Sequence, residues 1–251
     1  MEARVRALVV SDLHANAEAL RAVFARVRRK KFDHIICLGD FVGYGAQPNQ
    51  VLDSMRTFKG AKKVYIRGNH DRVAAGLDDA DGFNAAAKHA AIWTREHLSP
   101  PNRRFLRDLV HGPVLRDNVQ LCHGSPHDED EYVFNGHHAA AVFSQTEARF
   151  ILYGHTHMPV IFALDDNGYV EGAAIRGDAT LRLSPSYRYL MNPGSVGQPR
   201  DRNPEASFAI FDSKALTVQY FRVPYDVKKT QATIVNAGLP RILADRLSIG
   251  T

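Results

Sequence analysis

The chain has 251 residues, of which 45% are hydrophobic and 24% are charged, a composition typical of an ordinary soluble globular protein. No apolar run approaches the ~20 residues that a transmembrane helix needs, and the N-terminus lacks the pattern of a signal peptide. We therefore expect no membrane partner and a cytoplasmic location. The two cysteines, Cys37 and Cys122, are expected to be buried thiols rather than a disulfide, which suits a reducing compartment.

The beginning of the chain alternates apolar runs of strand type with amphipathic runs of helix type. A helix is predicted over 16–29, where Asn16 is a good N-cap, and another begins at 47–49. This order predicts parallel strands joined by crossover helices. The strands are predicted at residues 5–10, 33–38 and 62–66.

The middle and later parts of the chain differ in pattern. A helical insertion is expected at about residues 72–111, and a helix at about 138–147 follows an acidic loop. From residue 160 the pattern is β-rich, with a good hairpin turn at 165–168. These later strands are expected to form a second sheet packed on the first. They are predicted at 160–164, 169–170, 180–183, 187–191, 206–212 and 216–222.

The chain becomes helical again at about residues 226–248. An apolar stripe in this segment is expected to pack onto the rest of the protein, with a homodimer contact as the alternative. Its residues are Leu239, Ile242, Leu243 and Leu247. Because no flexible linker or internal repeat interrupts the chain, residues 1–251 are predicted to form a single domain.

The formal net charge of +5 could favour an anionic substrate or nucleic acid. The densest cluster of positive charge, at 26–31, falls at the end of the first predicted helix, where cations complement the helix dipole. No aromatic residues are interleaved with it. A solvated helix end is therefore the preferred interpretation, and nucleic acid is not expected as a partner.

Five apolar runs of strand type each end in Asp, Asn or His, usually beside a glycine. In an open α/β sheet, ligands bind in the crevice outside the carboxyl ends of the strands. We therefore expect these side chains to converge there. They are Asp12 and His14 after the first run, Asp40 after the second, Asn69 and His70 after the third, His123 after the fourth, and His155 and His157 after the fifth.

Apart from His70, this set contains three Asp or Asn oxygens and four imidazoles. A mixed set of this kind suits divalent transition metals (Mn, Fe, Zn, Ni or Co) better than Mg or Ca, which prefer oxygen ligands. Seven ligands exceed what one ion usually takes, but they suit two ions that share a bridging carboxylate. Paired ions roughly 3.5–4 Å apart generate a hydroxide nucleophile and stabilise an in-line displacement at phosphorus.

The motifs resemble those of the calcineurin-like metallophosphoesterases and occur in that family's order. The likeness also includes the loop 192–197, which resembles one in the small prokaryotic phosphodiesterase branch. The resemblance implies an α/β fold in which two β-sheets form a sandwich with helices outside, in four αββα layers. The motifs are Asp12-x-His14, Gly39-Asp40, Gly68-Asn69-His70-Asp71, His123-Gly124 and Gly154-His155-x-His157.

The resemblance also implies a role for each motif residue. Asp40 would bridge two metal ions, because an anionic carboxylate can neutralise two cations with its two oxygens. His70 would remain unligated and protonate the leaving oxygen as a general acid, with a capping or core histidine as the alternative. One ion would be held by Asp12, His14, Asp40 and His157, and the other by Asp40, Asn69, His123 and His155.

Residues 41–45 depart from one branch of the superfamily. In the Ser/Thr phosphoprotein phosphatases the Gly-Asp motif continues with Asp-Arg-Gly, which orients the catalytic histidine and grips phosphate. Here the sequence after Asp40 is Phe-Val-Gly-Tyr-Gly, which counts against a protein phosphatase. Asp71 is the nearest candidate to orient His70. The candidate substrate contacts are Tyr44, Arg72 and Arg200, although for the two arginines an ordinary surface position is the preferred interpretation.

The sequence therefore predicts a dinuclear metal-dependent phosphohydrolase that acts on a small phosphorylated substrate. A phosphodiester of aryl or nucleotide type is the first choice, and a dinucleoside polyphosphate or a phosphomonoester is the alternative. A non-catalytic metal-binding scaffold is the alternative from another class of function. The scaffold is disfavoured because the chain retains His70 and every expected metal ligand.

Overall fold

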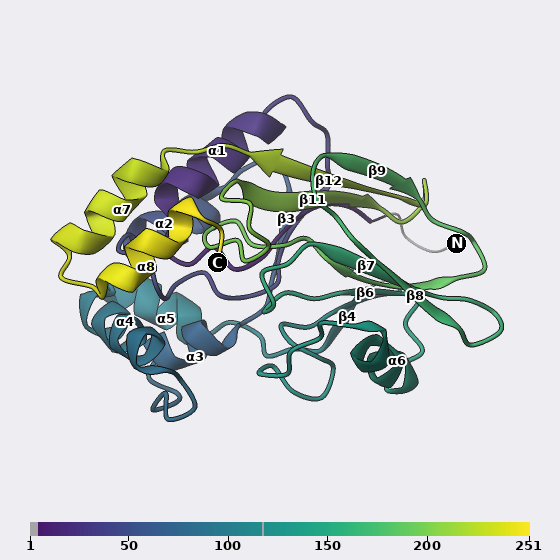
Figure 1. Cartoon of the computed structure of the whole chain (residues 1–251), viewed down its shortest axis with the longest axis horizontal. Coiled ribbons are helices and arrows are strands. Elements are labelled where there is room, and N and C mark those ends of the chain that lie inside the picture. Colours follow the sequence, from purple (N-terminus) through teal and green to yellow (C-terminus); the bar gives the residue numbers. More distant parts are fainter. Residues whose placement is uncertain (1–4, 117) are drawn as a thin grey trace.

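Two six-stranded β-sheets pack face to face, and helices cover their outer faces (Figure 1). The structure is a computed structural model that describes residues 5–116 and 118–251. Its layers run helix, sheet, sheet, helix, which confirms the predicted four-layer α/β sandwich.

The first sheet has the strand order β3-β2-β1-β11-β12-β9. Strands β1, β2 and β3 run parallel through crossover helices α1 and α2, as predicted, so all three end at the same edge of the sheet. The other three strands run antiparallel to their neighbours. The bounds are β1 Arg6–Val10, α1 Ala17–Val27, β2 His34–Cys37, α2 Pro48–Thr57, β3 Lys62–Tyr65, β9 Ala179–Arg182, β11 Ala206–Asp212 and β12 Thr217–Val223.

The second sheet has the strand order β4-β5-β6-β10-β7-β8. Strands β5, β6 and β10 are parallel, and β7 and β8 form the predicted hairpin around residues 165–168. Helix α6 lies against the β7–β8 side of this sheet (Figure 1). The bounds are β4 Val114–Arg116, β5 Val119–Leu121, α6 Gly136–Ser144, β6 Phe150–Leu152, β7 Val160–Leu164, β8 Val170–Ala174 and β10 Arg188–Asn192.

The prediction that all later strands form the second sheet is wrong for β9, β11 and β12, which extend the first sheet. Strand β11 explains why, because all seven of its residues are buried. Phe208 and Ile210 face the helices, whereas Ala209 and Phe211 face the opposite sheet. A strand that is apolar on both faces fits the middle of a covered sheet, and β11 lies there between β1 and β12.

Burial of alternating side chains holds the layers together. Val9, Ile36 and Leu152 contribute to the core between the sheets, whereas Leu20 and Val23 of α1 pack against the outer face of the first sheet. The two cysteines are buried free thiols, as predicted. No helix within the described residues combines the length and the apolar character that crossing a membrane requires.

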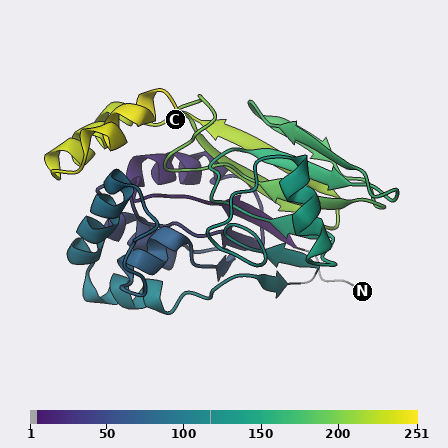
Figure 2. The same cartoon turned by 60° about the horizontal axis from the view of Figure 1, so that its bottom comes forward.

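Two helical segments lie at one end of the molecule (Figures 1 and 2). They share a small core that includes Tyr44, Ala90 of α4, and Ile234 and Leu243 of the C-terminal segment. Ile242, by contrast, is 63% exposed. The bounds are α3 Asn69–Ala74, α4 Ala85–His97, α5 Pro100–Arg107, α7 Val227–Asn236, α8 Arg241–Asp245 and the 3₁₀ helix η1 Arg246–Ser248.

Candidate metal centre and catalytic site

The loops after the strands have a strained backbone. The backbone N–H of Asp12 donates to Gly39 O (3.0 Å) and that of His14 to Asp40 O (3.0 Å), which joins the loops after β1 and β2. Left-handed backbone costs a non-glycine residue about 1–3 kcal/mol and clusters at functional sites. The positive φ angles are 54° at Asp12, 43° at His14, 55° at Asp40, 65° at His155 and 59° at His157. Strain concentrated at these residues is typical of a functional site.

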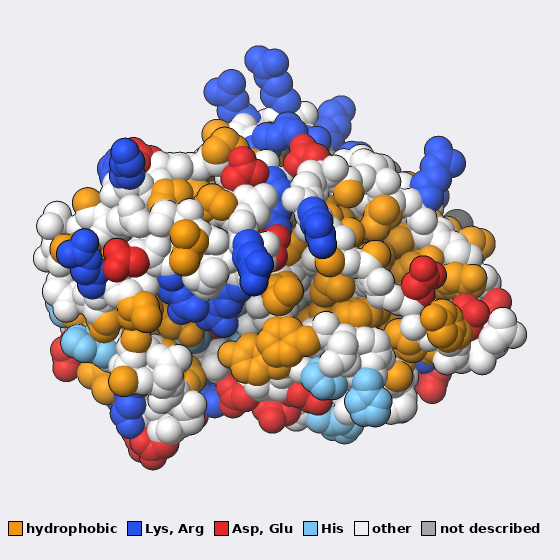
Figure 3. All heavy atoms as spheres, in the orientation of Figure 1, with side chains coloured by type: hydrophobic (Ala, Val, Ile, Leu, Met, Phe, Trp, Pro, Cys, Tyr) orange, Lys and Arg blue, Asp and Glu red, His pale blue; other side chains and the backbone are white. Residues whose placement is uncertain are grey.

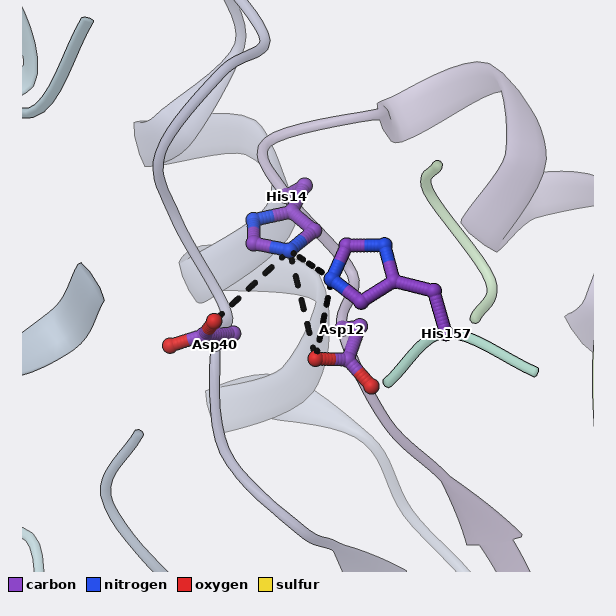
Figure 4. A group of neighbouring side chains, drawn as sticks. All are labelled: Asp12, His14, Asp40 and His157. Atoms are coloured by element: carbon purple, nitrogen blue, oxygen red, sulfur yellow. Dashed lines mark hydrogen bonds and ion pairs between the residues drawn. The ribbon is translucent and has the colours of Figure 1, made fainter. Parts of the chain in front are cut away.

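Asp12, His14, Asp40 and His157 form a first cluster of buried side chains, and Figure 4 shows them converging. The Nε2 atoms of His14 and His157 lie 3.0 Å apart. Asp12 Oδ1 lies 3.4 Å from His157 Nε2, and Asp40 Oδ2 lies 3.6 Å from His14 Nε2. One ligand atom from each residue lies within 4.8 Å of all the others, which is close enough for one ion.

A second cluster contains Asp40, His123 and His155, whose ligand atoms also lie within 4.8 Å of one another. His123 Nε2 is 3.3 Å from Asp40 Oδ2 and 3.3 Å from Asn69 Oδ1. Asp40 belongs to both clusters. The structure therefore brings all seven predicted ligands to one edge of the sandwich, with Asp40 between the two groups. Their assignment to two ions stays a prediction.

The backbone fixes how the imidazoles present their lone pairs. A carbonyl only accepts hydrogen bonds, so a ring nitrogen bonded to it carries the proton and the other nitrogen is free to bind a metal. Three rings expose Nε2 in this way. His155 instead donates through Nε2 to the Asp130 carbonyl (3.1 Å) and exposes Nδ1. The three Nδ1 bonds are His14 to Val42 O (3.0 Å), His123 to Leu38 O (2.7 Å) and His157 to Gln198 O (2.6 Å).

Burial governs the charges in these clusters. Burial raises the pKa of Asp12 to about 7, although His123 acts against it. Burial also acts to raise the pKa of Asp40, but His123 and His70 outweigh it and hold that pKa well below its ordinary value. For His123, attraction to Asp40 outweighs burial and raises the pKa to about 10. In the absence of a metal ion Asp40 and His123 are thus a charged pair, whereas Asp12 is a buried carboxyl without a matched cation. His123 Nε2 becomes available to a metal ion only when the imidazolium loses that proton.

The donor set fits divalent metal ions. Both carboxylate oxygens of Asp12 and Oδ2 of Asp40 are buried and accept no hydrogen bond from the described residues. Buried polar atoms without partners are costly, and two imidazole lone pairs 3.0 Å apart repel each other. A cation held between these atoms removes both costs. The chain therefore carries buried His and Asp groups suited to binding metal ions.

His70 lies beside the clusters and faces a cavity. Its backbone N–H donates to Asp40 Oδ1 (2.9 Å), and its ring packs between Tyr44 (4.3 Å between centroids) and Phe83 (4.5 Å). With Asn69 and other residues it lines a cavity of about 320 Å³. Burial lowers the pKa of His70 to about 4, although Asp40 acts to raise it. The ring is thus placed next to the predicted metal ligands and next to a cavity.

Asp71 does not orient the His70 ring. Its carboxylate accepts hydrogen bonds from the backbone N–H groups of Val42 (3.2 Å) and Gly68 (3.1 Å), which joins the loops after β2 and β3. The His70 ring is held by packing instead. A Cβ atom at Gly43 would lie 2.4 Å from His70 Nδ1, so the ring needs a glycine at this position of positive φ.

The guanidinium of Arg72 is already neutralised. It pairs with Asp78 (2.9 Å), with Asp130 (2.8 Å) and, at close contact, with Glu129. These carboxylates come from the loop after α3 and from the acidic loop before α6. Because the Asp130 carbonyl accepts from His155, Arg72 contributes to positioning that imidazole.

Unlike Arg72, Arg200 has only neutral hydrogen-bond partners among the described residues. Its guanidinium donates to Tyr44 Oη (3.2 Å) and Gln198 Oε1 (3.1 Å), and it forms no ion pair within residues 5–116 and 118–251. The Tyr44 ring lies 4.6 Å from the His14 ring. Tyr44 therefore holds the Arg200 cation beside the first cluster, where its charge is available to an anion.

Comparison with known proteins identifies the family. The model of the calcineurin-like phosphoesterase superfamily domain matches residues 5–215. The chain belongs to the calcineurin-like phosphoesterases. A metallophosphoesterase from Sphaerobacter thermophilus is 35% identical, with a TM-score of 0.86, over 99% of this chain and 100% of that one.

Two further proteins resemble this calcineurin-like phosphoesterase over nearly all of their length. An uncharacterized protein of Methanocaldococcus jannaschii is 35% identical over 96% of this chain and 97% of its own length. A hypothetical protein from Pyrococcus horikoshii shares the fold, with a TM-score of 0.80 at 22% identity over 98% and 99% of the two chains. The predicted family is thus confirmed, and the chain is a hydrolase that acts on phosphoester bonds.

Some residues of this calcineurin-like phosphoesterase site were not predicted from the sequence. Tyr132 stacks on His155 (4.1 Å) and lines the same cavity as His70, but its position in an acidic loop gave no signal. Ser195 Oγ donates to Asp12 O (2.8 Å), and Asn192 Nδ2 donates to Gly154 O (2.7 Å). The loop 192–197, noted earlier only for its resemblance, thus supports the loops that carry the predicted ligands Asp12 and His155.

Proposed function

We propose that the protein is a dinuclear metal-dependent phosphodiesterase with His70 as the general acid. The observation that carries the proposal is the position of Asp40. Its Oδ2 faces ligand atoms of both clusters, and its Oδ1 holds the backbone of His70 at 2.9 Å. One carboxylate therefore sets the distance between the metal ligands and the proton donor.

Two divalent ions, when bound here, would supply Lewis acidity and a water of lowered pKa. The chain's own residues would bind the phosphate and protonate the leaving group. The Arg200 guanidinium binds a nonbridging phosphate oxygen, which a charge-assisted hydrogen bond stabilises. The anionic substrate favours the protonated form of His70, because a nearby negative charge raises the pKa of an imidazole. The protonated ring then donates to the leaving oxygen as the P–O bond breaks.

The cavity beside His70 favours a leaving group without phosphates. Two carboxylates, Asp78 and Asp130, line it together with a single arginine, Arg72, that pairs with both. Its other walls include the rings of Phe83 and Tyr132. This cavity would repel a polyphosphate chain but suits an aryl group or a nucleoside. A phosphodiester therefore fits better than a dinucleoside polyphosphate.

A small organic substrate also fits better than nucleic acid. The basic cluster at the end of α1 is partly used within the protein, since Lys30 (4.4 Å) and Arg26 (5.3 Å) lie over the Phe221 ring. Arg26 also pairs with Asp178 (3.3 Å). These contacts support the interpretation of the cluster as a stabilised helix end.

The test is hydrolysis of diphenyl phosphate, whose phenol leaving group needs a proton to depart, by the Mn²⁺-loaded protein and its His70→Asn variant. Loss of the general acid should lower kcat by about 10²–10⁴-fold while metal content, measured by mass spectrometry, is unchanged. His89→Asn is the matched control, because His89 is an exposed histidine on α4. Its kcat should equal that of the wild type.

Two results would contradict the proposal. Wild-type protein that cleaves p-nitrophenyl phosphate but no diester is a phosphomonoesterase. Metal-loaded protein that cleaves neither ester, with or without His70, supports the non-catalytic scaffold instead.

A further inference from the structure

A second and larger cavity, of about 600 Å³, lies beside the metal ligands and is not used by the mechanism above. Phe134, Met158, Arg176, Arg200 and Arg202 are among its lining residues. On the face shown in Figure 3, hydrophobic side chains and Lys or Arg side chains lie side by side between α8 and β7. This cavity therefore combines apolar walls with positive charge.

Stacked rings separate the second cavity from the one beside His70. Tyr132, which lines the first cavity, stacks on Phe134, which lines the second, at 5.2 Å and an angle of 6°. Tyr132 also stacks on His155. Thr156, between two of the predicted metal ligands, lines the second cavity as well. The two cavities thus flank the metal centre.

Arg200 connects the second cavity to the reacting phosphate. Its backbone N–H donates to His157 O (3.3 Å), and its guanidinium reaches Tyr44 beside the first cluster. Because Arg200 lines the second cavity and its partner Tyr44 lines the first, a phosphate held by Arg200 would lie between the two cavities.

The walls of the second cavity specify what would enter it. Phe134 is 52% exposed and Met158 is 37% exposed, so both present apolar surface to a ligand. Arg176 and Arg202 form no ion pair within residues 5–116 and 118–251, whereas the one carboxylate in the wall, that of Asp201, pairs with Arg222. The cavity suits a ring-bearing arm that is neutral or anionic and disfavours a cationic arm.

We propose that this cavity is the subsite for the arm of the diester that remains on phosphorus. The inference rests on the proposed phosphodiesterase function and deepens it. Water adds to phosphorus, the P–O bond on the His70 side breaks, and the leaving oxygen takes a proton from His70. The P–O bond on the Phe134 side stays intact, so the product is the phosphomonoester of the arm held in the second cavity.

Two substrates with the same leaving group test the assignment. Thymidine 5′-(p-nitrophenyl phosphate) retains a ring-bearing arm without positive charge, and p-nitrophenyl phosphorylcholine retains a cationic arm without a ring. Because both release the same leaving group, p-nitrophenol, into the His70 cavity, the ratio of their kcat/KM values reports on the retained arm alone. The wild type should have a kcat/KM for the thymidine ester at least about tenfold higher than for the choline ester. The choline arm has no ring, and the absence of one stacking contact accounts for a difference of this size.

Two variants should lower this ratio for different reasons. Phe134→Ala should reduce kcat/KM for the thymidine ester by about 5- to 100-fold, the usual effect of removing an aromatic stacking partner, and should leave the choline ester unaffected. Arg202→Ala should raise kcat/KM for the choline ester, because it removes a repelling charge. Tyr169→Ala, 68% exposed on the β7–β8 hairpin, is the control and should leave the ratio unchanged.

The outcomes separate the subsite from the proposed function. If the wild type cleaves both diesters equally, or if Phe134→Ala leaves the ratio unchanged, the subsite assignment is overturned and the phosphodiesterase proposal stands. An equal decrease in kcat/KM for both substrates in Phe134→Ala is one form of the unchanged ratio. It would mean that Phe134 acts through Tyr132 and not on the retained arm. If the wild type cleaves neither diester, both proposals fail.

Discussion

The uncompensated burial of Asp12 makes a prediction about stability. Asp12 is 0% exposed, its oxygens have no hydrogen-bond partner among the described residues, and burial raises its pKa from 3.8 to about 7. In the metal-free protein the folded state therefore holds this proton more tightly than the unfolded state. Stability is lost as pH rises from about 4 through 7, and the loss is complete above pH 7.

The magnitude follows from the two pKa values. They differ by about 3, and each pH unit between them costs about 1.4 kcal/mol, so ionised Asp12 destabilises the metal-free fold by up to about 4 kcal/mol. Asp12→Asn removes this cost, and Asn tolerates the positive φ of 54° at this position. In EDTA at pH 8 the variant should be more stable than the wild type by a few kcal/mol. At pH 4 the difference should largely vanish.

Urea unfolding followed by circular dichroism, at both pH values and with EDTA or Mn²⁺, measures the effect. With Mn²⁺ the difference should narrow, because a ligand at 100 times its Kd stabilises the wild type by about 2.7 kcal/mol, against a cost of up to about 4 kcal/mol, and Asn is a weaker ligand. Asp166→Asn, at an exposed turn position, should change stability by less than about 0.5 kcal/mol. The reasoning is refuted if metal-free Asp12→Asn is less stable at pH 8, or if its effect is the same at both pH values.

Two further predictions concern the arginines of the site. Arg200→Gln should lower kcat/KM for bis(p-nitrophenyl) phosphate by about 10- to 100-fold, because a charge-assisted hydrogen bond to phosphate is lost. Metal content should stay constant, and an unchanged kcat/KM would exclude Arg200 as the phosphate contact. Arg72→Ala should loosen the loop that orients His155, because Arg72 pairs with Asp130 and the Asp130 carbonyl accepts from His155. A titration with Mn²⁺ should show a metal affinity about 10- to 100-fold weaker, and an unchanged affinity would rule out this positioning role.

Sequence patterns predicted the features that are set by residues close together in the chain, such as the ends of the parallel strands and the N-cap of α1. The strands ending at Val10 and Cys37 deliver Asp12 and Asp40 to one edge because parallel strands share a direction, which the strand–helix alternation reveals. Asn16 caps α1 by accepting from Ala19 N (3.1 Å), as its position predicted.

Other features depend on residues far apart in the chain. Strand β11 pairs with β1 across about 200 residues, and its apolar pattern alone fits either sheet. The partners of Asp71 are backbone groups of other loops, so adjacency to His70 was misleading. The second cavity combines residues from several loops and strands, and no single stretch of sequence encodes it.

The two carboxylate oxygens of Asp40 have different partners, and this links metal binding to the position of His70. Because Oδ2 faces the ligand atoms and Oδ1 holds the His70 amide, the carboxylate cannot rotate toward one without pulling on the other. In the proposed dinuclear enzyme, loss of one ion would therefore also shift the position of His70. Half-loaded preparations should be slow through misalignment of the acid as well as through the missing charge.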